Sequence, residues 1–261
     1  MSNFDWTSAS DDEVDHQYSP SRFALKPLDD YLAEYAQLSS PFRNVSLTSH
    51  GAPLLIYIHG GYWQRLSADD SLFNAADAQS VGVSLHAVEY TLAPHATIAE
   101  IVNECAEDVI RVIEHLQPSR VVIAGCSAGA HLTAMCVRRS DIQKKVDGIA
   151  LLSGIYDVRP IVRTPTNEPL HLTAESAAEI SPQLLPAVPS PPKALLAVGE
   201  HESSEFIRQN KAFGELLQVN GADVTVSVIP ERDHFNLPYD LLRSQTSVGD
   251  WVIDILKGKS S

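Results

Sequence analysis

The sequence predicts a doubly wound, mostly parallel α/β sheet, and three observations support this prediction. Short apolar runs, which are typical of buried strands, alternate with segments whose apolar residues recur at helical spacing. The chain has 261 residues, 44% of them hydrophobic, which is enough for one α/β domain with a large core. It contains no internal repeat and no linker that would divide it. We therefore expect a single domain over residues 1–261.

The individual elements follow from local patterns. The acidic run at 11–15 indicates a solvated N-terminal arm within residues 1–40, and apolar residues behind an acidic turn predict a short helix at 29–36. Alternation at 45–47 indicates an edge strand. Apolar runs rich in β-branched residues predict the main strands, at 54–58, 81–89, 121–124, 146–152, 194–198 and 224–229. Apolar residues at helical spacing predict helices, at 98–116, 130–137, 205–219 and 247–256.

Residues 155–192 differ in composition from the rest of the chain. They are rich in proline, serine and threonine, and they contain only a short alanine-rich helix candidate at 174–180. Because such a segment supplies no further strand, we expect it to form a lid-like insertion over the sheet.

Charge and cysteine content limit the class of partner. A net charge of −14 argues against nucleic acid or an anionic membrane surface as partner. Cys105, Cys126 and Cys136 are odd in number and lack metal-ligand spacing, which is typical of reduced thiols in a cytosolic protein. The sequence shows no signal-peptide pattern and no apolar run as long as a membrane span. We expect a cytoplasmic protein that acts on a small molecule, and the sequence leaves a homodimer open.

The stretch from Val121 to His131 joins a predicted strand to a predicted helix through the pattern G-x-S-x-G. Side chains at Gly125 and Gly129 would collide with the neighbouring strand and helix. Such a turn presents the Ser127 hydroxyl above the sheet, at the positive end of the helix that follows. The pattern also occurs in glycine-rich turns without chemistry, so the rest of the chain must supply the partners of a nucleophile.

A serine nucleophile needs a base, and the base needs an acid that orients it. After a strand–turn–helix of this kind, the acid and then the histidine follow the serine along the chain. Of the ten histidines, His234 lies in the loop after the last predicted strand, where the base is expected. His131, one turn into the helix, is expected to be buried structure.

The acid is expected after the strand at 194–198. Glu200 and Glu202 both lie there, and spacing alone does not separate them. The other carboxylates are less well placed: Glu205 is typical of a helix N-terminus, Asp157 follows a different strand, and Asp233 adjoins the base but would point away from it.

The oxyanion formed during acyl transfer needs backbone N–H donors close to the serine. The N–H group of Ala128 opens the helix after Ser127, and a Gly-Gly turn follows the strand at 54–58. By position, Gly61 and Tyr62 supply the other two N–H groups.

Taken together, these motifs resemble those of the arylformamidases (kynurenine formamidases) in the α/β-hydrolase superfamily. The resemblance spans residues 18–236 and implies the α/β-hydrolase fold. The similar segments are the HGGxW element at His59–Gln64, the YSPSR element at Tyr18–Arg22, the strand-end segment Glu89–Pro94, the GxSAGAH turn at Gly125–His131, the HDSPEF-like loop His201–Phe206 and the DHF loop Asp233–Phe235.

The resemblance implies hydrolysis of an N-formyl arylamine, with N-formylkynurenine from tryptophan breakdown as the usual substrate, through an acyl-enzyme on Ser127. It favours Glu202 as the acid because this residue aligns with the family's aspartate. Glutamate at this position and Ser203-Ser204 in place of Ser-Pro are departures from the family pattern. No metal or organic cofactor is needed.

Tyr62 and Trp63 follow the Gly-Gly turn, where an aromatic leaving group could stack on them. The alternative for both residues is packing within the lid. We expect them to contact the substrate.

Three other functions use the same residues or the same fold. One is a carboxylesterase acting on small acyl esters, and another is an acyltransferase or biosynthetic amidase with the same three side chains. The third is a binding protein without turnover; such proteins usually lack one member of the triad, whereas this chain has a candidate for each.

Overall fold

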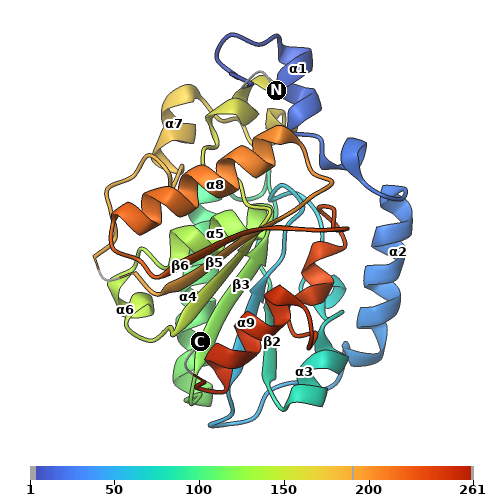
Figure 1. The fold of residues 1–261 in the computed structure, drawn as a ribbon, viewed down its shortest axis with the longest axis vertical. Helices are drawn as coiled ribbons and strands as arrows, with labels where there is room; N and C mark the ends of the chain where they lie inside the picture. Colours follow the sequence, from blue (N-terminus) through green and yellow to red (C-terminus); the bar gives the residue numbers. More distant parts are fainter. Residues whose placement is uncertain (1–3, 190, 260–261) are drawn as a thin grey trace.

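The computed structural model describes residues 4–189 and 191–259; residues 1–3 of the predicted arm and residue 190 of the predicted insertion lie outside the described residues. In this part of the chain, six parallel strands form one sheet in the order β2-β1-β3-β4-β5-β6. Figure 1 shows this sheet in the middle of the molecule, between helices. The doubly wound parallel sheet predicted from the sequence is therefore confirmed. The strands are β1 (Leu54–Ile58), β2 (Ser84–Val88), β3 (Val121–Cys126), β4 (Gly148–Leu152), β5 (Lys193–Gly199) and β6 (Val224–Ile229).

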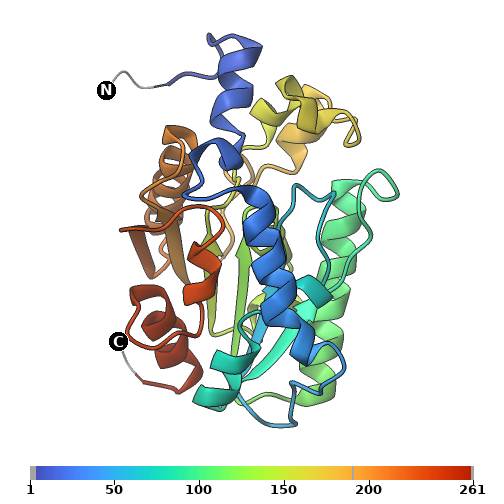
Figure 2. The same ribbon diagram turned by 90° about the vertical axis from the view of Figure 1, so that its right-hand side faces the viewer.

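Helices cover both faces of the sheet (Figures 1 and 2). Leu54, Ile56 and Ile58 of β1 share one buried cluster with α4, α5 and α8, whereas Leu55 and Tyr57 share the other with α2, α3 and α9. Burial on both faces explains why the strands are continuous apolar runs. The helices are α1 (Asp11–Gln17), α2 (Leu28–Ser39), α3 (Ala75–Val81), α4 (Ile98–Leu116), α5 (Ala128–Cys136), α6 (Ser140–Gln143), α7 (Ala174–Glu179), α8 (Ser204–Val219) and α9 (Ser247–Leu256). Among the described residues, no helix combines the length and apolar character needed to cross a membrane.

Three local predictions are wrong. The acidic run is not a solvated arm but helix α1, which begins with a capping box in which Ser10 and Glu13 satisfy each other's backbone N–H groups. Residues 45–47 form a loop that meets β2 through one backbone hydrogen bond, from Leu85 N–H to the Leu47 carbonyl (3.0 Å). Val81 ends α3 rather than starting β2, because Gly82 adopts a left-handed conformation (φ 63°) that terminates the helix.

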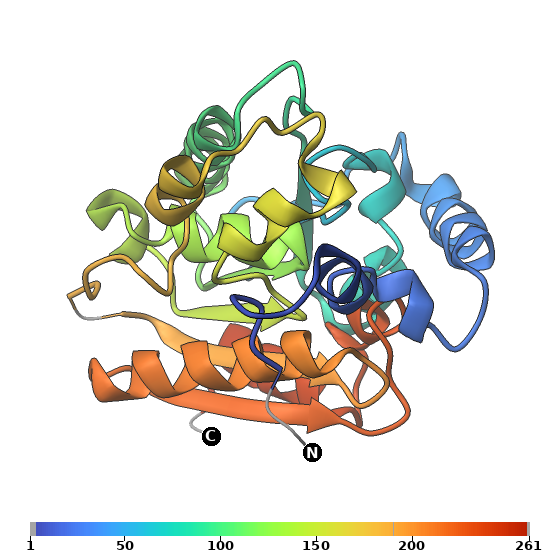
Figure 3. The same ribbon diagram turned by 90° about the horizontal axis from the view of Figure 1, so that it is seen from above.

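The N-terminal segment (residues 4–23) and the first part of the insertion (residues 155–180) lie side by side above the carboxyl ends of the strands (Figure 3). The Arg163 guanidinium joins them, since it bonds to the Asp11 carboxylate and to the carbonyls of Trp6 and Ala9. These two segments, far apart in sequence, therefore form one cover over the same edge of the sheet.

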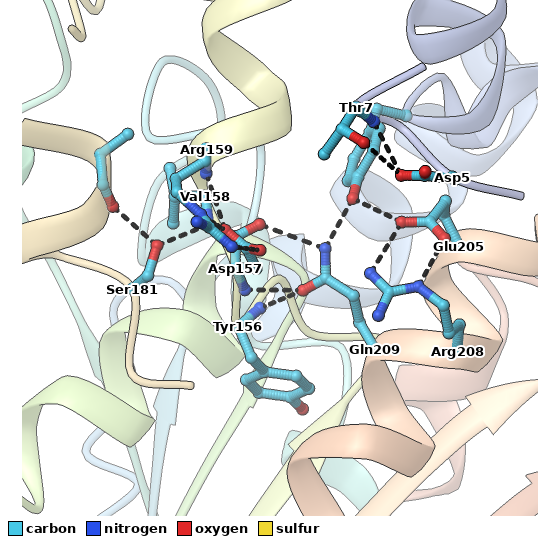
Figure 4. A network of polar contacts seen from close by, with 12 residues as sticks. Asp5, Thr7, Tyr156, Asp157, Val158, Arg159, Ser181, Glu205, Arg208 and Gln209 are labelled. Carbon is cyan, nitrogen blue, oxygen red and sulfur yellow. Dashed lines mark hydrogen bonds and ion pairs between the residues drawn. The ribbon is translucent and has the colours of Figure 1, made fainter. Parts of the chain in front are cut away.

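A buried polar network fixes this cover to α8 (Figure 4). Gln209 accepts a hydrogen bond from Asp157 N–H (2.8 Å) and donates one to the Tyr18 hydroxyl (2.7 Å). That hydroxyl donates in turn to Glu205 (2.9 Å), whose carboxylate pairs with Arg208 (2.6 Å). Because these side chains are buried or partly buried and satisfy one another, the network holds the N-terminal segment and the insertion in fixed positions.

Candidate active site

Ser127 occupies the sharp turn between β3 and α5, in the strained conformation expected from its motif (φ 58°, ψ −121°). The flanking glycines are required by sterics. A Cβ atom on Gly125 would lie 2.2 Å from the Gly129 carbonyl oxygen, and one on Gly129 would lie 2.0 Å from that of Ile58. The turn therefore packs against α5 and β1 with no room for side chains on either side of the serine.

His234 and Glu202 form a buried hydrogen-bonded pair. His234 Nδ1 donates to Glu202 Oε2 over 2.7 Å, and the other carboxylate oxygen accepts from the Ser153 hydroxyl (2.5 Å) and from Gly199 N–H (2.7 Å). Since an ionised carboxylate only accepts hydrogen bonds, this pairing puts the ring proton of neutral His234 on Nδ1. Nε2 is then an acceptor, and it has no partner among the described residues.

The other carboxylates considered from the sequence do not contact His234 in the described chain. Glu200 lies on the surface and accepts a hydrogen bond from Glu231 N–H. The remaining three are buried in other interactions: Asp157 with Arg159, Glu205 with Arg208 and Tyr18, and Asp233 with Leu25 N–H and the Tyr31 hydroxyl. Of the carboxylates considered, Glu202 is thus the one that contacts His234 in the described chain.

The Gly-Gly turn after β1 lies directly beside Ser127. A Cβ atom on Gly60 would lie 2.7 Å from the Cys126 carbonyl oxygen and 3.2 Å from Ser127 Cβ. The backbone N–H groups of Gly61, Tyr62 and Ala128 donate to no group among the described residues. None of these three N–H groups is therefore used by a hydrogen bond within this part of the chain.

Trp63 is not where the sequence interpretation expected it. Its side chain is fully buried, and its indole N–H donates to His131 Nδ1 (3.3 Å) rather than facing a ligand. Positive φ angles at both Tyr62 and Trp63 turn the indole into the core. Tyr62 does reach the cavity described below, although its hydroxyl donates to the Tyr18 carbonyl (2.5 Å).

A cavity of about 760 Å³ opens beside Ser127 and His234. Its walls come from the N-terminal segment, α2, the turn after β1, the insertion and the loop after β6. Four aromatic residues of this lining, here called the aromatic wall, are not predicted from the sequence to contact a ligand: Tyr35, Tyr57, Phe73 and Phe235. From the insertion, Pro165, Thr166, Glu168 and Pro169 line the same cavity.

His131 is buried structure, as expected. Its Nε2–H donates to the Ile180 carbonyl (2.7 Å) and its Nδ1 accepts from the Trp63 indole, so both ring nitrogens are hydrogen-bonded. Burial lowers the pKa of His131 to about 4, and burial lowers that of His59 to about 4 as well. Neither ring takes part in the Glu202 pairing.

These lowered pKa values predict acid destabilisation. The pKa of His131 is about 4 in the folded chain and about 6.5 in the unfolded chain. Below pH 6.5 the unfolded chain therefore binds more protons than the folded chain. The free energy of unfolding should therefore fall as the pH drops from 6.5 towards 4, by up to about 3 kcal/mol for His131. Urea unfolding between pH 7.5 and 4.5 measures this slope. His131→Gln should flatten it, and an unchanged slope in that variant would contradict the assignment.

Comparison with known proteins agrees with this geometry. The family model described as the α/β hydrolase fold matches residues 55–237. The chain is 34% identical to a kynurenine formamidase of Danio rerio, over 89% of this chain and 92% of that one. It is 33% identical to a kynurenine formamidase of Salmo salar, over 98% and 99% of the two chains.

A solved structure supports the fold alone. The crystal structure of a Silicibacter sp. TM1040 protein, provisionally described as a thioesterase, matches with a TM-score of 0.80 at 23% identity, over 94% of this chain and 99% of that one. Fold and family model together define an α/β hydrolase. Within that class, the chain belongs to the arylformamidase-like α/β hydrolases, and it is a hydrolytic enzyme.

Proposed function

We propose that this enzyme hydrolyses an N-formyl arylamine, such as an N-formylkynurenine-like amide, through an acyl-enzyme on Ser127. The observation that carries the proposal is that His234, which is hydrogen-bonded to Glu202, lines the same cavity as Ser127. The relatives named kynurenine formamidase support the choice of a formamide as substrate.

In the proposed reaction, His234 Nε2 takes the proton of the Ser127 hydroxyl as the oxygen attacks the formyl carbon. Glu202 stabilises the imidazolium that forms. His234 then protonates the departing arylamine, and the formyl group stays on the serine as an ester. Water, deprotonated by His234, attacks this ester and releases formate, which regenerates the serine.

The oxyanion of both tetrahedral intermediates is held, in this proposal, by the N–H groups of Gly61, Tyr62 and Ala128. These donors are fixed by the Gly-Gly turn and by the start of α5, so they need no reorganisation during the reaction. The aromatic wall, together with the Tyr62 ring, supplies a surface for the aryl group of the substrate.

We further propose that residues 1–261 act as one domain in which the insertion forms a partial lid. Four residues of the insertion line the cavity, and the side-chain amide of Gln64 donates to the Thr166 carbonyl (2.9 Å). This bond ties the insertion to the turn that carries the oxyanion donors.

A carboxylesterase is the second candidate, because the same nucleophile and donors would attack a small ester. The thioesterase description of the similar Silicibacter structure favours ester chemistry in that protein. An acyltransferase or a biosynthetic amidase would use the same three side chains.

A substrate panel separates these functions. We expect kcat/KM for N-formylkynurenine and formanilides to exceed that for p-nitrophenyl acetate by about tenfold or more, since a pocket fitted to one acyl and leaving group discriminates against others. A fluorophosphonate probe should label Ser127, and peptide mass spectrometry would locate the labelled residue. Preference for the ester would favour the carboxylesterase, and labelling elsewhere would contradict the proposed nucleophile.

A further inference from the structure

Tyr57 differs from the other tyrosines that line the cavity. Among the described residues, the hydroxyls of Tyr18, Tyr35 and Tyr62 all donate to protein oxygens, on Glu205, Phe235 and Tyr18 respectively. The Tyr57 hydroxyl has no hydrogen-bond partner in the same part of the chain, although the residue is only 3% exposed and lines the cavity. The unused polar group therefore belongs to the cavity rather than to the core.

The surroundings of Tyr57 favour a ligand that accepts a hydrogen bond from its hydroxyl. Its ring packs edge-on against Phe73 (centroids 5.7 Å apart), and the other members of the aromatic wall line the same cavity. Burial raises the pKa of Tyr57 well above its usual value, so the phenol stays protonated and can donate. A donor in an apolar wall favours any ligand that brings an acceptor to it, because no protein group competes.

Tyr57 also lies within reach of a substrate held at Ser127. The sheet register pairs Tyr57 of β1 with Ala124 of β3, three residues before Ser127. At about 3.3 Å per residue, this places the Tyr57 backbone roughly 10 Å along the strand direction from the nucleophile. A formanilide whose formyl carbon meets Ser127 can therefore direct a ring substituent towards the Tyr57 side chain.

We infer that the Tyr57 hydroxyl selects aryl substrates whose ring carries a hydrogen-bond acceptor, such as a carbonyl group, by donating to that acceptor. This inference rests on the proposed function, because it takes the aryl group of the substrate to lie along the aromatic wall. Tyr57 is thus a specificity-determining residue and takes no part in bond breaking.

Matched substrates test the inference. Formanilides with an acetyl group at the 2-, 3- or 4-position are compared with formanilides that carry an ethyl group at the same position, which removes the acceptor and keeps the shape. In the wild-type enzyme, kcat/KM should favour the acetyl compound by about fivefold to tenfold at the position that meets Tyr57, the usual effect of one hydrogen bond. Tyr57→Phe should lower this ratio by about the same factor, which leaves only the electronic effect of the acetyl group on the departing arylamine.

Tyr156→Phe is the matched control. The Tyr156 hydroxyl is also buried without a partner in the described chain, but it packs against Phe213 in the core and does not line the cavity. This variant should keep the acetyl-to-ethyl ratio of the wild type. Two results would overturn the inference. One is an acetyl-to-ethyl ratio of kcat/KM near one at all three positions in the wild type, and the other is a ratio in Tyr57→Phe equal to that of the wild type.

A binding measurement keeps this test separate from the proposed function. Calorimetry with 2-aminoacetophenone and 2-ethylaniline compares the same pair of groups without turnover. If formanilides are not hydrolysed but the wild type binds the acetyl compound about fivefold more tightly and Tyr57→Phe does not, the inference holds and the proposed reaction fails. Equal affinities in the wild type would contradict the inference alone.

Discussion

Ser127→Ala should lower kcat for the preferred substrate by at least about 10⁴-fold, because the remaining N–H donors cannot replace a covalent nucleophile. The fold should not change, since alanine keeps the Cβ atom and the same backbone conformation in the turn (φ 58°). Steady-state kinetics measures the loss, and circular dichroism with thermal unfolding measures the fold.

Ser80→Ala is a suitable control for this variant. Ser80 lies on the exposed side of α3, where its hydroxyl bonds to the Asp77 carbonyl. Its removal should leave kcat within about twofold, as is usual for surface substitutions. A Ser127→Ala enzyme that keeps more than a tenth of the wild-type rate would exclude the acyl-enzyme mechanism.

Glu202→Ala should reduce kcat by about 10³- to 10⁴-fold, whereas Glu200→Ala should change it by less than about threefold. The first substitution removes the hydrogen-bond partner of His234 Nδ1, which in the proposed reaction fixes the His234 tautomer and balances the imidazolium charge. The second removes an exposed carboxylate whose one hydrogen bond among the described residues comes from the Glu231 backbone N–H. Parallel kinetics on the two purified variants, checked for equal thermal stability, makes the comparison.

The isosteric variant Glu202→Gln tests whether catalysis needs the negative charge of Glu202 or only the shape of its side chain. It keeps the volume of the side chain and its contacts with Ser153 and Gly199 but loses the negative charge, so a large loss of kcat is still expected. If Glu200→Ala were the more damaging change, the acid would be assigned wrongly and the His234–Glu202 bond would be structural.

The regular elements could be predicted because their signals are local. Helix α4 begins and ends at the predicted residues, since Thr97 and Glu100 form a capping box and the apolar stripe is continuous. The same kind of signal is present at Ser10 and Glu13, but an acidic run without an apolar stripe resembles a solvated arm, so helix α1 is not predicted.

The cavity walls could not be predicted in the same way. Tyr35, Phe73 and Phe235 come from segments that meet only in the folded chain, so no local pattern marks them as neighbours. Trp63 shows the opposite error: its position beside the Gly-Gly turn suggested a ligand contact, whereas two successive positive φ angles point it into the core. Side-chain direction at a strained turn depends on tertiary packing and cannot be read from sequence.

The ties between α2 and the loop after β6 have a consequence for synthesis on the ribosome. Leu25 N–H and the Tyr31 hydroxyl both bond to Asp233, and the Tyr35 hydroxyl bonds to the Phe235 carbonyl, across about two hundred positions of sequence. The segment that walls one side of the chamber is thus translated about two hundred residues before its docking partners. The nascent chain cannot close the chamber until the loop after β6 has emerged.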